Sequence, residues 1–231
     1  MNIEAITRGP ALRRILVVNP NGNPDVTARV QRTANGVIGN GCIAVAVNPA
    51  DSPRSIETPE DRRNAEPEAI KLLSQSPGFD AYVMACFDDI AIKEGRRILT
   101  APIVNTVEAS VSFARMLAKR FAIVTTVDTM VPGICGLLET LGAAKQCTVR
   151  AAGISVAAAA SDDADSDWLL DQTIRQARDA DGAGAIILGS GGLTGKARIL
   201  ADRHRIPVID CIEAGVLMAE AASRFRVPSD G

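Results

Sequence analysis

The sequence predicts an α/β fold made of two similar halves, each built on a doubly wound parallel sheet, with a cleft between them. Short aliphatic runs alternate with helical stretches, which is the pattern of strands covered by helices on both faces. The chain also repeats itself: "PIVNTVEAS" begins at residue 102 and "PVIDCIEAG" at residue 207, an offset of 105 residues. Two more pairs, "ILVVNPNGN" with "FAIVTTVDT" and "AYVMACFDD" with "AIILGSGGL", recur at offsets of 106 and 104 residues. Three matches near one offset predict an internal duplication.

Each half is expected to contribute four strands separated by helices. In chain order, the predicted strands cover residues 15–18, 43–47, 81–85, 103–104, 122–124, 152–156, 185–188 and 208–209. The predicted helices include residues 24–37, 65–73, 108–118, 131–141, 168–178 and 213–222, with a further helical stretch over 194–203. We assign residues 1–105 together with 211–231 to the first half, and residues 106–210 to the second.

The composition excludes several classes of protein. Hydrophobic residues make up 47% of the 231 residues, so the chain can bury a sizeable core, and aromatic residues make up only 3%, so that core is aliphatic. The formal net charge of -2 and the scarcity of stacking aromatics give no support for a nucleic acid or membrane partner. No apolar run reaches membrane-spanning length, and the first residues lack a secretory signal, so we expect a cytoplasmic protein.

No metal site is expected either. The five cysteines show no CxxC spacing, and His204 is the single histidine, which we predict to lie on the surface. A free cysteine is usually buried and packs like a small hydrophobic residue, so a reactive role for any one of them needs further support.

Polar clusters follow four of the predicted strands at equivalent positions of the repeat. Because ligands of open α/β sheets bind beyond the carboxyl ends of the strands, these clusters are expected to line the cleft. They are residues 19–21, 86–89, 125–126 and 190–192.

Ser190 lies in the glycine-rich stretch "LGSGGLTG", which fits no phosphate loop, dinucleotide fingerprint or nucleophile elbow. A Ser–His hydrolase is also disfavoured, because a helix over residues 194–203 would carry His204 about 15 Å away. The repeat instead makes Ser190 the equivalent of Cys86. Acid and base groups on opposite sides of a carbon are what proton removal and return at a stereocentre require.

From Ile15 to about Ala222, the chain resembles the hydantoin racemases of the aspartate/glutamate racemase superfamily. The resemblance rests on five segments: Asn19-Pro20-Asn21, Ala85-Cys86-Phe87 with Asp89, Glu108-Ala109, "VTTVDTMVP" from Val124, and "PVID" from Pro207. The resemblance implies an enzyme that needs no cofactor. One cysteine thiolate removes a proton next to a carbonyl and a second cysteine protonates the opposite face.

Cys86 matches the first cysteine of that family, but Ser190 stands where the family motif G-C-A-G has the second. Gly22, Asp88 and Cys211 are further departures from the family pattern. A serine hydroxyl is a poor base, although it can form hydrogen bonds. Three explanations stay open: a Cys→Ser variant engineered at position 190 of a two-cysteine racemase, a natural one-cysteine enzyme, or a cleft that only binds. One-cysteine relatives include decarboxylases and maleate-type cis–trans isomerases, and Cys86 could also open a cyclic amide.

We predict Cys86 and Ser190 as the catalytic pair, acting on a small cyclic amide or small carboxylic acid, in a homo-oligomer. The predicted substrate-binding residues are Asn19, Asn21, Phe87, Asp88, Thr125, Thr126, Gly189 and Gly191.

Lesser expectations concern the neighbouring residues. Either Asp88 or Asp89 is expected to cap the next helix, Glu108 and Glu213 to lie in first helical turns, and residues 162–167 to form a solvated helix start. Tyr82 and Trp168 are expected to be packing residues rather than ligand contacts.

Overall fold

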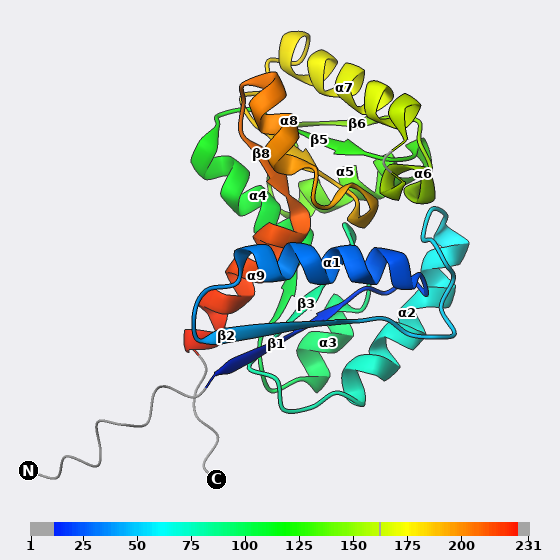
Figure 1. Ribbon diagram of the computed structural model, residues 1–231, viewed down its shortest axis with the longest axis vertical. Helices are drawn as coiled ribbons and strands as arrows, with labels where there is room; N and C mark the ends of the chain where they lie inside the picture. Colours follow the sequence, from blue (N-terminus) through cyan, green and yellow to red (C-terminus); the bar gives the residue numbers. More distant parts are fainter. Residues whose placement is uncertain (1–11, 162, 226–231) are drawn as a thin grey trace, which may run out of the picture.

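The computed structural model describes residues 12–161 and 163–225, and over these it contains two four-stranded parallel sheets (Figure 1). The first sheet has the order β2-β1-β3-β4, with β1 (Arg13–Val18), β2 (Cys42–Val47), β3 (Ala81–Met84) and β4 (Ile103–Asn105). The second has the order β6-β5-β7-β8, with β5 (Phe121–Thr125), β6 (Cys147–Ala151), β7 (Ile186–Leu188) and β8 (Val208–Asp210). The identical orders confirm the predicted fold class of two similar parallel-sheet halves.

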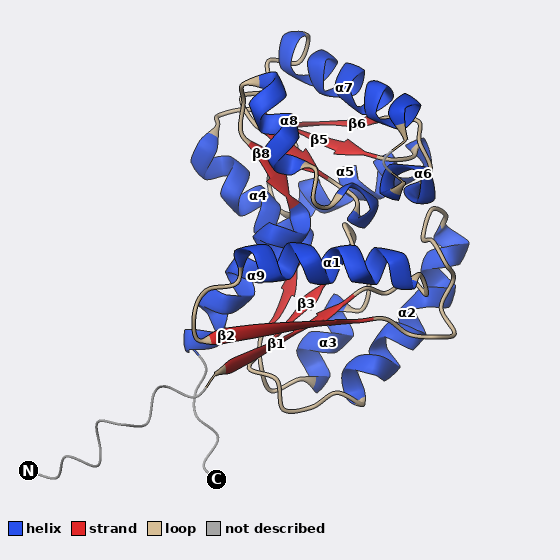
Figure 2. Cartoon of the chain, viewed as in Figure 1, coloured by secondary structure: helices blue, strands red, loops and turns tan. Residues whose placement is uncertain are grey.

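Helices cover both faces of each sheet (Figure 2). In the first sheet Ile15 shares an apolar cluster with Val30 of α1, whereas the next residue, Leu16, shares another with Ala69 of α2. This alternation makes the sheet doubly wound. The helices are α1 (Pro24–Val37), α2 (Pro59–Ser74), α3 (Ile92–Ile98), α4 (Thr106–Leu117), α5 (Val131–Thr140), α6 (Val156–Ala160), α7 (Ala164–Asp179), α8 (Ala197–His204) and α9 (Cys211–Ala222).

Two helices cross between the halves. Helix α4 follows β4 of the first sheet but contacts β7 and β8 of the second, and α9 follows β8 but contacts β1 and β3 of the first. Equivalent side chains begin both helices: Asn105 Oδ1 accepts from the Val107 N–H at 2.7 Å, and Asp210 Oδ1 accepts from the Ile212 N–H at 2.8 Å. The division at residues 105 and 210 falls at these junctions and stays a prediction, because one apolar cluster joins both halves.

The sequence prediction was wrong for one strand. We expected a strand over residues 152–156, but β6 ends at Ala151 and α6 begins at Val156, after its cap residue Ser155. Strand β6 lies at the edge of its sheet, where Thr148 and Arg150 alternate with apolar residues. The prediction favoured a continuous apolar run and therefore missed an alternating edge strand. The short helices α3 and α6 were not predicted.

Two side-chain predictions were also wrong. His204 is buried rather than on the surface, and Asp171 Oδ1, 2.7 Å from its Nε2, satisfies the buried ring. Trp168, expected as a packing residue, is 61% exposed on α7.

Several expectations about helix starts and packing are confirmed. Glu108 and Glu213 lie in the first turns of their helices, and Tyr82 is buried. Asp163 caps α7 through the Ser166 N–H, as expected of a helix start, while residue 162 of that stretch lies outside the described residues.

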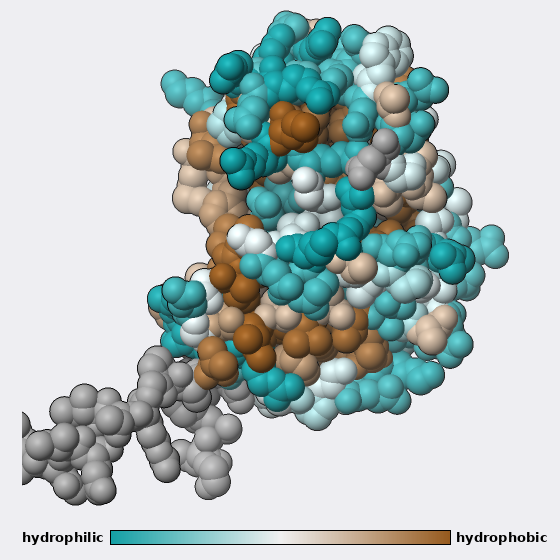
Figure 3. Space-filling model, in the orientation of Figure 1, coloured by the Kyte–Doolittle hydropathy of each residue, from teal (hydrophilic) through white to brown (hydrophobic). Residues whose placement is uncertain are grey.

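The outer strand β2 leaves apolar side chains on the surface. Ile43 is 41% exposed and Val45 is 38% exposed, and Figure 3 shows apolar residues gathered over this strand. Within the described ranges, no helix has both the length and the apolar character needed to cross a lipid bilayer.

Close packing of α9 on its neighbours generates a prediction about stability. A Cβ at Gly215 would lie 2.9 Å from both Thr106 Cγ2 and Val83 Cγ1, two β-branched side chains with little freedom to move. We expect Gly215→Ala to lower the free energy of unfolding by about 1–3 kcal/mol, as other overpacked cores do. Urea denaturation measures this change.

The matched control is Gly136→Ala in α5, where nothing lies within 4 Å of an added Cβ. Here alanine should raise the free energy of unfolding by up to about 1 kcal/mol, because it lowers the backbone entropy of the unfolded chain. Equal effects of the two substitutions would contradict the packing argument.

Candidate active site

Residues from the carboxyl ends of four strands line one cavity between the two sheets. The wall contains Asn21 after β1, residues 85–87 after β3, residues 125–126 at the end of β5, and residues 189–192 after β7. The cavity has a volume of about 40 Å³. That is far below the several hundred Å³ typical of ligand pockets. A ring-sized substrate needs a wider cavity than this one.

Cys86 and Ser190 lie on this wall, one from each half. Cys86 follows β3 and is half-buried, and its carbonyl oxygen accepts a hydrogen bond of 2.7 Å from Thr106 Oγ1 at the start of α4. The helix that crosses between the halves therefore helps to position the cysteine.

Burial raises the pKa of the Cys86 thiol well above its ordinary value, and the nearby Asp88 carboxylate raises that pKa further. The Arg62 guanidinium acts in the opposite direction and lowers it. Because the upward effects dominate, Cys86 is a protonated thiol at neutral pH in this state of the protein. Such a group is ready to donate a proton, and it becomes a base only as its surroundings change or the pH rises.

Arg62 of α2 organises the carboxylates that follow Cys86. Its Nε lies 3.3 Å from Asp88 Oδ1, its Nη2 lies 2.7 Å from Asp89 Oδ1, and its Nη1 lies 3.0 Å from Glu66 Oε2. The expectation that Asp88 or Asp89 caps the next helix was wrong. Helix α3 starts after Ala91 with no side-chain cap, since Arg62 holds both carboxylates. The importance of Arg62 could not be seen in the sequence, because 24 positions separate it from Cys86.

Ser190 is 8% exposed, and its Oγ accepts a hydrogen bond of 3.2 Å from the Gly192 N–H. This contact uses a lone pair of the hydroxyl and leaves its proton available to a ligand in the cavity. The glycine before it is required by space, because a Cβ at Gly189 would lie 2.6 Å from Ile123 Cγ2 and 3.1 Å from Phe87 Cδ1. Phe87 of the first half thus packs against Gly189 of the second half, the residue before Ser190.

The other predicted binding residues fall into two groups. Asn21, Phe87, Thr125, Thr126, Gly189 and Gly191 line the cavity. Thr125 already donates from Oγ1 to the Gly189 carbonyl at 3.0 Å, so its hydroxyl proton links β5 to the Ser190 turn.

Asn19 and Asp88 do not belong to the cavity wall. Asn19 Nδ2 donates to Asn21 Oδ1 at 2.8 Å and to Thr27 Oγ1 at 3.0 Å, so it shapes the turn that presents Asn21. Asp88 pairs with Arg62, and its charge raises the pKa of the Cys86 thiol. Their substrate-binding roles therefore stay predictions, and the contacts in the structure are those of positioning residues.

Sequence reasoning missed three apolar residues of the wall, which are Ile56, Met130 and Val156. Next to it, Glu57 bridges the two halves: its Oε1 accepts from the Val156 N–H at 2.8 Å, and its carbonyl accepts from Thr129 Oγ1 at 2.5 Å. These residues lie in loops and short helices outside the repeated segments, so neither periodicity nor the repeat could point to them.

Among the residues that the structure describes, no three His, Cys, Asp or Glu side chains are grouped so that they could hold a metal ion. The wall instead offers one thiol, several hydroxyls and backbone N–H groups. These groups can move a proton and stabilise a developing oxyanion.

Comparisons with known proteins identify the family of the chain. A family model described as Asp/Glu/Hydantoin racemase matches residues 15–219. A hydantoin racemase of Rhizobium meliloti is 35% identical over 210 residues, which cover 90% of this chain and 87% of that protein. A hydantoin racemase of Paenarthrobacter aurescens is 32% identical, with 90% of each chain covered.

A solved structure gives the same result for the fold. The allantoin racemase from Klebsiella pneumoniae superposes with a TM-score of 0.89 at 30% sequence identity. The match covers 92% of this chain and 88% of the other. The two-sheet architecture is thus shared with a racemase over most of the length of both chains.

The charges around Cys86 generate a prediction about its reactivity. Because Asp88 raises the thiol pKa, Asp88→Asn should increase the rate of Cys86 alkylation by iodoacetamide at pH 8 by up to about tenfold, a factor that corresponds to one pKa unit. Arg62→Gln should slow alkylation, because it removes the charge that favours the thiolate. In the unaltered protein the rate should keep rising with pH across the neutral and alkaline range.

Peptide mapping by mass spectrometry follows Cys86 separately, with the exposed Cys135 as an internal reference. Asp89→Asn is the matched control, because the Asp89 carboxylate is not among the groups that shift the pKa of Cys86. A rate that is unchanged or lower in Asp88→Asn would show that this carboxylate does not govern the thiol.

Proposed function

The chain belongs to the Asp/Glu/hydantoin racemase family, and we propose that Cys86 performs its acid–base chemistry on a carbon next to a carbonyl of a small cyclic amide. The chain is accordingly an enzyme of the racemase superfamily, a racemase-type isomerase that acts on a small molecule. The observation that carries the proposal is the meeting of Cys86 and Ser190, from equivalent strand ends, on the wall of one cavity. Relatives named hydantoin racemase and allantoin racemase support the substrate class.

In the proposed step, Cys86 first loses its thiol proton to solvent, and the resulting thiolate takes the proton bonded to the carbon next to the carbonyl. The electron pair of that C–H bond moves toward the carbonyl oxygen and forms an enolate. The Thr126 hydroxyl and the Phe87 and Gly191 N–H groups are the donors proposed to stabilise the oxyanion. The resulting Cys86 thiol can return a proton to the same face. Besides solvent, this sequence of steps uses only groups of the chain, so the proposed reaction needs no cofactor.

Inversion requires a proton from the opposite face, where Ser190 lies. Its hydroxyl is a far weaker acid than a thiol, so delivery of a proton from this side should be slow unless water takes part. The proposal therefore predicts an asymmetric enzyme that exchanges the substrate proton with solvent faster than it interconverts the enantiomers.

The same serine favours a second candidate, a one-cysteine reaction. In that case Cys86 protonates a carbanion after CO₂ leaves, adds to a double bond, or attacks a carbonyl of a cyclic amide. A Cys→Ser variant engineered at position 190 would give the same cavity with its natural racemisation impaired.

The proposal also includes a homo-oligomer in a reducing compartment such as the cytoplasm. All five cysteines are free, which supports a reducing environment. Exposed apolar side chains on α4 and β2, among them Met116 at 71% exposure, support association of copies.

The test uses one enantiomer of a 5-substituted hydantoin in D₂O. We expect NMR to show loss of the Cα–H signal, and Cys86→Ala should slow this loss at least ~100-fold, the usual contribution of a general base. Ser190→Cys should accelerate racemisation, measured by polarimetry, at least ~10-fold, because a thiol then faces the opposite side of the carbon. Ser190→Ala is the matched control, because it removes the hydroxyl without supplying an acid.

Full exchange by Cys86→Ala, corrected for the rate without enzyme, would overturn the role of the cysteine. Net ring opening or CO₂ release by the unaltered chain, with no gain in Ser190→Cys, would establish the one-cysteine candidate instead.

A further inference from the structure

A cavity much larger than the active-site cavity lies away from Cys86. It is a groove of about 790 Å³ between α1 of the first half and the start of α8 in the second. Its wall shares no residue with the active-site cavity, although Thr194 follows Ser190 by only four positions. A volume of this size accommodates a ligand of ordinary metabolite size.

The wall of this groove is basic in a chain whose formal net charge is -2. Two carboxylates, of Asp167 and Glu213, face five cationic side chains, which are Arg29, Arg32, Lys196, Arg198 and Arg203. Burial and the nearby Asp210 carboxylate raise the pKa of Glu213. The summed potential of such a wall attracts anions.

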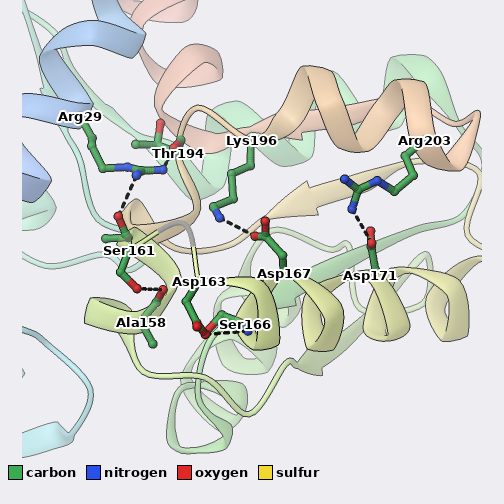
Figure 4. A network of polar contacts seen from close by, with 11 residues as sticks. Arg29, Ala158, Ser161, Asp163, Ser166, Asp167, Asp171, Thr194, Lys196 and Arg203 are labelled. Carbon is green, nitrogen blue, oxygen red and sulfur yellow. Dashed lines mark hydrogen bonds and ion pairs between the residues drawn. The ribbon is translucent and has the colours of Figure 1, made fainter.

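Three of the cations have structural contacts, which Figure 4 shows. Lys196 Nζ lies 2.6 Å from Asp167 Oδ1, and Arg203 pairs with Asp171. Arg29 donates to the Ala160 carbonyl at 2.8 Å and to the Thr194 carbonyl at 3.1 Å, and so ties α1 to two segments of the second half. These contacts shape the groove.

The other two cations, Arg32 and Arg198, are exposed and lie on opposite walls. Within residues 12–161 and 163–225, neither makes a hydrogen bond or an ion pair. Each guanidinium can therefore present its planar set of donors to a carboxylate or phosphate group. Because one guanidinium lies on each wall, a ligand that pairs with both needs at least two anionic groups.

The two walls are held at a fixed separation. Thr194 Oγ1 lies 3.0 Å from Thr33 Oγ1 of α1 and 2.8 Å from the buried carboxylate of Asp210, which also accepts from the Gly195 N–H at 2.6 Å. A preformed arrangement of this kind lowers the entropic cost of binding.

We propose that this groove binds a compact polyanion, with two or more phosphate or carboxylate groups held between Arg32 and Arg198. The ligand bridges the two halves of the protein, beside the turn that carries Ser190, and stabilises their contact. The site is separate from the proposed catalytic cavity, so this proposal does not rest on the identity of the substrate.

The test is calorimetric titration of the purified full chain at low ionic strength with pyrophosphate and, in a second arm, with citrate. We expect a Kd below ~1 mM for at least one of them, and the arm that binds identifies the anionic group. The double variant Arg32→Gln/Arg198→Gln should weaken that binding at least tenfold. Binding of the unaltered chain should also weaken as salt is added, since salt screens exposed charges.

The matched control is Arg63→Gln/Arg175→Gln, which removes two exposed arginines that do not line the groove. It should leave the Kd within about twofold. Equal weakening in both double variants, or no binding of either anion at 10 mM, would overturn the proposal.

Alkylation of Cys86 before titration separates this site from the active site. Binding that survives alkylation supports the groove. If alkylation abolishes binding, the anion occupies the catalytic cavity and the groove assignment is wrong, whereas the proposed function would still stand.

Discussion

The structure depends on the packing of the two helices that cross between the halves. Helices α4 and α9 contact each other and each covers the sheet of the other half, so one apolar cluster contains residues of both sheets, such as Val83 and Ile187. Burial of this shared surface aligns the sheets with their carboxyl ends facing one cleft. Neither half can keep its own core while it rotates freely against the other. The separation of Cys86 from Ser190 is therefore a consequence of core packing rather than of the loops alone.

Polar contacts add to the apolar packing between the two halves. The buried carboxylate of Asp210 accepts from Thr194, Gly195 and Ile212, which satisfies it without a positive partner. Its repeat equivalent, Asn105, makes the corresponding helix cap and, within the described residues, no further side-chain hydrogen bond. The extra contacts of Asp210 couple the start of α9 to the turn after Ser190.

The duplicated scaffold carries unequal chemistry on its two sides. On the first side a half-buried thiol is flanked by Arg62 and Asp88, whose charges shift its pKa in opposite directions. On the second side a hydroxyl accepts from Gly192 and has no charged neighbour on the cavity wall. Duplication supplies two equivalent strand ends, but the side chains around each end decide whether it acts as an acid, a base or a hydrogen-bond donor. This inequality is the basis for expecting different rates on the two faces of the substrate.

The sequence by itself determined the duplicated α/β architecture, the strand ends that carry polar residues and the pairing of Cys86 with Ser190. These features follow from the periodicity of apolar residues and from an offset between repeats, both of which are local or recurrent patterns. Only the tertiary structure decided that Asn19 shapes a turn and that His204 is buried against Asp171. It also brought Arg62 to Cys86 and placed Arg32 opposite Arg198. The reason is physical: these contacts join residues far apart in the chain or depend on side-chain direction, and neither leaves a periodic trace in the sequence.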